Sequence, residues 1–108
     1  MTTNPGEQVT LRANIVKATK AAHIVELETE EATNSAKAAA KAADRAEEAL
    51  NKADPKNGDY NNIVKSYNDA KAVFSSALAA ETKAWRERVA TARDLDAAKA
   101  AAKAAYAI

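Results

Sequence analysis

The chain has 108 residues with 16 basic and 15 acidic side chains, and its net charge of +1 gives no electrostatic reason to expect nucleic acid or an anionic membrane as a partner. It contains 30 alanines but only two glycines, two prolines and one phenylalanine, a composition typical of coiled coils and long helices. The absence of cysteine excludes disulfides and thiol nucleophiles.

Residues 1–6 combine Thr, Asn, Pro and Gly and therefore predict an irregular arm. No basic segment followed by an apolar run occurs here, so we expect no signal peptide, and no later stretch reaches the length of a transmembrane helix. The expected location is the cytoplasm, or a virion assembled there.

A first helix is predicted over 7–53, because residues recur along it at alternating spacings of four and three, the period of a coiled-coil seam. Thirteen consecutive positions from Leu11 to Ala53 keep this spacing, and Thr29 is the only one of them that is not apolar. From Ala32 onward the seam is almost entirely alanine, which buries little area unless a facing helix supplies larger side chains. The members of this seam that we assign to the hairpin core are Leu11, Ile15, Val25, Ala39 and Leu50.

The run Thr33, Asn34 and Ser35 is the one local challenge to a continuous first helix, because these residue types are good helix N-caps. A break there would give three helices instead of two. The phase of the seam does not change across the run, and this favours one helix of about 45 residues.

The segment 54–59 is the strongest chain break in the sequence. Pro55 disfavours a helical conformation for the residue before it, and Asn57-Gly58 readily adopts positive φ. The chain is expected to reverse here, with Asp59 as the N-cap of a second helix over 60–106.

The second predicted helix carries the large side chains that the alanine seam requires. The members of its apolar stripe that we assign to the core are Ile63, Tyr67, Phe74, Trp85 and Leu95. If Leu50 lies beside Ile63 across the turn, the numbers of facing residues add to about 113, so that Ala39 faces Phe74. The expected fold is a single all-α domain over 1–108, a long antiparallel helical hairpin with an alanine-rich seam, completing a bundle by oligomerisation.

The same register makes two electrostatic predictions. It places Glu26 near Arg86 and Arg88, and it places Glu30 near Lys83. It also puts Glu81 and Arg88 inside the apolar stripe of the second helix. These two residues are either edge positions with aliphatic stems along the seam, or a polar pair that fixes the register or meets a partner chain.

A second apolar face lies on the first helix, about 180° from its seam at 100° per residue. Lys20 interrupts this face and Glu31 ends it. We call it the apolar ridge, and its members are Val9, Ala13, Val16, Ile24 and Leu27. A two-helix hairpin leaves the ridge in water, which indicates a surface for self-association or for a protein partner. The alternative is a set of scattered surface aliphatic residues, which are common.

Residues suited to chemistry are sparse. His23, Glu26 and Glu30 share a helical face at a spacing that could hold a metal, but di-metal bundles need a Glu-x-x-His from two helices, and a solvated charged face explains the trio. A thin hairpin also leaves no room for a pocket. We therefore expect no enzyme activity, no cofactor and no small-molecule substrate.

The segment 32–53 begins with the sequence ATNSAKAAAKAADRAEEA. It resembles the Ala/Ser/Thr/Asn/Lys-rich helical segments of bacteriophage tail-fibre stalks and other small virion proteins. The resemblance implies a structural role in several copies, such as decorating a capsid, joining it to a tail or anchoring a fibre. The turn at 54–59 departs from a continuous stalk. Two alternatives remain open, an adaptor that binds a different protein through the apolar ridge and a metal- or ligand-binding bundle.

Overall fold

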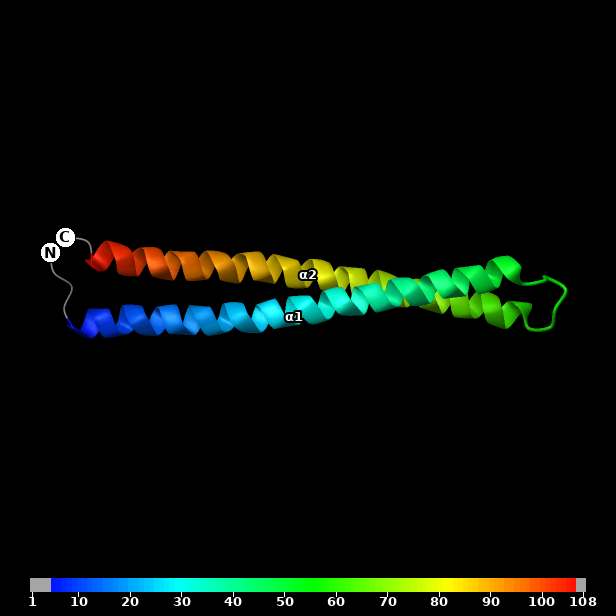
Figure 1. Ribbon diagram of the computed structural model, residues 1–108, viewed down its shortest axis with the longest axis horizontal. Helices are drawn as coiled ribbons and strands as arrows, with labels where there is room; N and C mark the ends of the chain where they lie inside the picture. Colours follow the sequence, from blue (N-terminus) through cyan, green and yellow to red (C-terminus); the bar gives the residue numbers. More distant parts are fainter. Residues whose placement is uncertain (1–4, 107–108) are drawn as a thin grey trace. The chain divides into compact units, whose positions relative to one another are not determined.

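The computed structural model describes residues 5–106, and these form two helices, α1 (Pro5–Lys52) and α2 (Tyr60–Tyr106), joined by a turn (Figure 1). The predicted fold class, an all-α helical hairpin, is confirmed. The run Thr33, Asn34 and Ser35 lies inside α1 and does not break it, so the prediction of one continuous first helix is also confirmed.

Contacts between residues group the chain into two units. Unit 1 joins residues 5–29 of α1 to residues 84–106 of α2, and unit 2 is Glu30–Lys83. In unit 1 the two segments run antiparallel, because the hydroxyl of Tyr106 contacts the carbonyl oxygen of Gln8 at 3.4 Å, and Thr29 contacts Ala84 farther along. In unit 2 the turn reverses the chain and brings the start of α2 back beside the end of α1 (Figure 1).

The beginning of α1 differs from the sequence expectation. Pro5 and Gly6 are helical, whereas an irregular arm was predicted over 1–6, and residues 1–4 of that arm lie outside the described residues. Proline is well suited to the first helical position, since its φ is already helical and the N–H that it lacks would have no intrahelical partner there. The helix ends at Lys52, and the next amide, of Ala53, donates to the carbonyl of Leu50 at 3.2 Å.

Side chains of the turn itself hold it in place. Asp54 Oδ1 accepts from the amide of Lys56 at 2.9 Å, and Asn57 Oδ1 accepts from the amide of Asp59 at 3.0 Å. The amide of Asn57 also donates to the carbonyl of Asp54 at 2.8 Å. The prediction of positive φ at Asn57-Gly58 is wrong, because no described residue has positive φ. Two successive side-chain turns reverse the chain without a left-handed residue.

Asp59 directly precedes α2, at the predicted N-cap position, and its carbonyl accepts from the amide of Ile63 at 3.0 Å. Within residues 5–106 the Asp59 carboxylate makes no hydrogen bond, so this side chain does not cap the helix. The side-chain hydrogen bond just before α2 is made instead by Asn57, which accepts from the Asp59 amide.

The seam of α1 follows the predicted spacing throughout. All thirteen positions from Leu11 to Ala53 are buried or half-buried, while most residues between them are exposed. The most buried alanines of α1 are Ala36, Ala39 and Ala43, which are 5–8% exposed. Among the predicted core residues, Ala39 is buried and the half-buried ones are Leu11, Ile15, Val25, Leu50, Ile63, Tyr67, Phe74 and Leu95.

The prediction that Trp85 belongs to the core is wrong, because its side chain is 46% exposed. The seam of α2 also keeps strict spacings of three and four, and it takes Ala84, Arg88 and Thr91 in this region. Trp85 lies one residue, or about 100°, beyond Ala84 and so misses the seam. The size of its side chain does not draw it inward, since the helical phase decides which residues face α1.

The predicted register is confirmed in unit 1, where Thr29 contacts Ala84 and the two residue numbers add to 113. Thr29 is the most buried polar residue described, at 1% exposure. Its hydroxyl donates to the carbonyl of Val25 at 2.7 Å and lies 3.3 Å from the carbonyl of Ala84. The hydroxyl of the one polar residue in the α1 seam therefore finds its hydrogen-bonding partner inside the helix pair.

Candidate interaction surface

The apolar ridge lies on the part of α1 that belongs to unit 1, and its side chains are open to solvent. Val9 is 67% exposed, Ile24 is 55% exposed, and Val16 and Leu27 are each 52% exposed. Ala13 is exposed as well. Four large aliphatic side chains therefore have more than half of their surface in water on one helical segment.

Helix geometry explains why the ridge stays uncovered. The seam residues of this segment contact α2, and residues about 180° away on the same helix point away from α2. A single facing helix covers only one side of α1. Any cover for the ridge must come from a group outside unit 1.

Charged side chains beside the ridge are ordered along the helix. Arg12, Lys17 and Lys20 come first, and Glu26 and Glu28 follow near its end. All five are exposed. The ridge therefore has a basic segment and an acidic segment, and this asymmetry gives it a direction.

One of these charges is engaged within unit 1. Oε1 of Glu26 lies 3.4 Å from a guanidinium nitrogen of Arg88, which confirms the predicted proximity. The Arg88 guanidinium also lies over the Trp85 ring, 5.0 Å from its centroid. Arg88 thus keeps its stem in the seam and its charged end at the surface, as expected for an edge position. Glu30 and Lys83, the second pair that the register places near each other, make no ion pair in the described structure.

An exposed aromatic side chain was missed by sequence reasoning. Trp85 and Val89 are 46% and 50% exposed, and Ala92 continues the same strip of α2 in unit 1. The signal that would have found this strip is the three-four spacing of Ala84 and Arg88, extended strictly instead of following the largest side chains.

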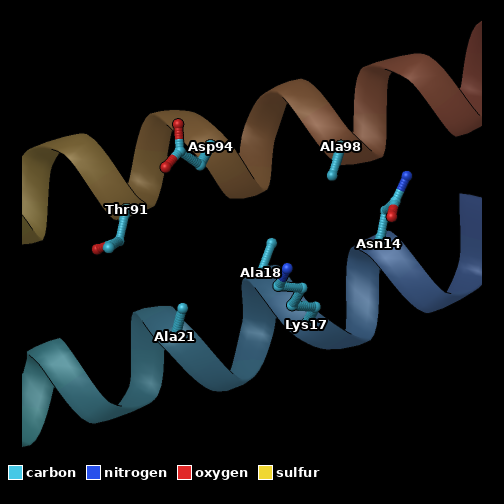
Figure 2. A pocket seen from close by; sticks show the side chains of 7 residues that line it. All are labelled: Asn14, Lys17, Ala18, Ala21, Thr91, Asp94 and Ala98. Atoms are coloured by element: carbon cyan, nitrogen blue, oxygen red, sulfur yellow. The ribbon is translucent and has the colours of Figure 1, made fainter.

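A shallow groove opens between the two helices of unit 1, contrary to the expectation that the hairpin leaves no room for a pocket. Its volume is about 270 Å³, and Figure 2 shows the methyl groups of Ala18, Ala21 and Ala98 facing into it. Polar side chains from both helices lie around these methyl groups, namely Asn14, Lys17, Thr91 and Asp94. The hollow follows from composition, since the short side chains of these alanines leave space that larger side chains would fill.

The side chains suited to chemistry do not converge. Among residues 5–106 no group of three His, Cys, Asp or Glu side chains could hold a metal ion. His23, the one histidine, is exposed on α1. Neither helix, over the part that the structure describes, has an apolar stretch long enough to cross a membrane.

Comparison with protein-family models, curated proteins and solved structures found no match. The functional interpretation therefore depends on the geometry of the surface itself.

Proposed function

We propose that this chain is a structural assembly protein that acts by helix packing and not by catalysis. The observation that supports this is the apolar ridge, in which four large aliphatic side chains of unit 1 are each more than half exposed. Aliphatic side chains gathered on one face are characteristic of protein interfaces. The chain would use the seam to fold and the ridge to assemble.

The energy available from the ridge suits reversible assembly. Burying the exposed half of one such side chain is worth about 1 kcal/mol, so four of them contribute about 4 kcal/mol on each copy. Association costs on the order of 4–15 kcal/mol in lost translational and rotational freedom. Ridges from both partners together offset a cost in the lower part of that range, which gives a concentration-dependent complex.

The assembly that we would search first is a virus particle, because residues 32–53 resemble helical segments of phage virion proteins. In that setting the chain would decorate a capsid, connect it to a tail or anchor a fibre, and several copies would be present. The cytoplasm in which such particles assemble is the corresponding location.

A ridge variant tests the proposal. Ile24→Glu combined with Leu27→Glu places two charges on the ridge without touching the seam, so the helix content should not change while the oligomer dissociates. Val73→Glu is the matched control, because Val73 is 61% exposed on α2 and lies outside the ridge. The masses are measured by sedimentation velocity at equal protein concentration.

Loss of the oligomer in the ridge variant alone supports the proposal. An oligomer of unchanged mass in the ridge variant shows that the interface lies elsewhere. A wild-type protein that is monomeric at every concentration rules out self-assembly, and the adaptor alternative, in which a different protein covers the ridge, would then replace it.

A further inference from the structure

We propose that the group covering the apolar ridge is the ridge of a second copy of this chain, docked antiparallel about a two-fold axis near Ala18. This inference rests on the proposed function and adds the identity and direction of the partner. The observations that support it are the order of charges along the ridge, the position of Lys20 within it and the exposed carboxylate of Glu26.

The charge order favours the antiparallel direction. Arg12 lies near the beginning of the ridge, Lys17 and Lys20 lie on either side of its middle, and Glu26 and Glu28 lie at its end. In an antiparallel pair about Ala18, Arg12 of each copy comes near Glu26 of the other, whereas Lys17 and Lys20 stay beside the axis. In a parallel pair basic meets basic and acidic meets acidic, which is unfavourable at both ends.

Arg12 and Glu26 give the most specific contact of this kind. They are 14 residues apart, which is about four helical turns, so they lie on the same side of the ridge. An antiparallel pair centred near Ala18 places Arg12 of one copy beside Glu26 of the other, and symmetry forms this contact twice. Glu26 is available for this contact, because its side chain is 58% exposed and Arg88 contacts only Oε1.

Lys20 is the polar interruption of the ridge, and its position also distinguishes an antiparallel pair from a parallel one. In a parallel pair in register, Lys20 would face Lys20 of the second copy across the interface. In the antiparallel pair it faces Val16, where its aliphatic stem covers the valine and its ammonium group reaches water. The ends of the ridge then match, with Val9 beside Leu27 of the second copy.

Spin-label distances test the direction, because the chain has no cysteine and an introduced one is labelled alone. Thr10→Cys and Thr19→Cys are suitable positions, since both threonines are exposed and their hydroxyls bond only to the carbonyls of Gly6 and Ile15 in their own helix. Labels at position 19 lie next to the proposed axis. Labels at position 10 are separated along the helix by 16 residues, or about 24 Å.

We therefore expect a short label distance at position 19 and a distance longer by about 20 Å at position 10. Equal distances at the two positions contradict the antiparallel arrangement and indicate a parallel pair. A wild-type chain that is monomeric contradicts the proposed function instead, so the two failures are distinguishable.

A charge reversal tests the contact independently. Arg12→Glu places like charges beside Glu26 of the second copy, and the dimer dissociation constant should rise several-fold, with the increase shrinking at high salt. The control is Arg93→Glu, an exposed position on the side of α2 away from its seam, which should leave the constant unchanged. A tighter or unaltered dimer in Arg12→Glu overturns the proposal.

Discussion

Replacing one buried alanine tests whether the two helices of unit 2 pack as closely as the seam implies. Ala39 is 8% exposed in the middle of the alanine segment, and the register places it opposite Phe74. Ala39→Leu adds three carbon atoms at a position where an alanine methyl group already fills the available space. The helices must separate or the leucine must adopt an unfavourable rotamer.

We expect Ala39→Leu to lower the free energy of unfolding by about 1–3 kcal/mol, the usual cost of overpacking a core. Helix propensity does not offset this loss, because leucine and alanine differ little in it. For a chain of this size a loss of 1 kcal/mol lowers the melting temperature by about 4–8 °C. The flanking alanines Ala36 and Ala43 are equally buried, so relaxation along the seam is restricted.

The assay is urea unfolding followed by far-ultraviolet circular dichroism, with every variant at the same protein concentration because self-association adds to apparent stability. Ala38→Leu is the matched control, since Ala38 is exposed on the same turn of α1 and should unfold like the wild type. Equal unfolding midpoints for Ala39→Leu and Ala38→Leu would refute the close packing of the alanine seam.

Three further substitutions should change the free energy of unfolding in a predicted direction, which urea midpoints can check. Thr33 Oγ1 is buried without a hydrogen-bond partner, so Thr33→Val should raise the free energy of unfolding by about 1 kcal/mol, whereas Thr29→Val removes a 2.7 Å bond and should lower it. Equal signs for the two variants, or both signs reversed, would contradict the assigned hydrogen bonds. Gly58 has no positive φ and no atom within 4 Å of an added Cβ, so Gly58→Ala should stabilise by about 0.4–1 kcal/mol, and a loss of stability would show that the turn requires glycine.

The seam and the turn could be predicted from sequence because each depends on local information. A strict three-four spacing fixes which side of α1 is buried, and Asp54 to Asp59 carry the residue types that interrupt helices. The register followed from one pairing at the turn, and the contact between Thr29 and Ala84 agrees with it.

The errors arose where side-chain size or residue type was given more weight than helical phase. Trp85 was assigned to the core because it is large, yet the phase of Ala84 and Arg88 leaves it at the surface. Asn57-Gly58 was expected to adopt positive φ, but the Asp54 and Asn57 side chains accept backbone hydrogen bonds that form the turn without it. In a chain so rich in alanine, the spacing of residues along the helix predicts which side chains are buried better than the size of the side chains does.

The candidate surface was only partly predictable. The sequence shows that Val9 and Leu27 lie opposite the seam, and the structure adds that they remain exposed. The groove beside Ala18 and Ala98 could not be predicted, because its volume depends on how closely the two helices approach each other.

The measurement that tests the central claim most directly is the absolute mass of the wild-type chain by light scattering on a sizing column over a range of concentrations. We predict a mass that rises from the monomer value of 11.4 kDa to at least that of a dimer as concentration increases. A mass that stays at the monomer value at all concentrations would contradict self-assembly through the apolar ridge.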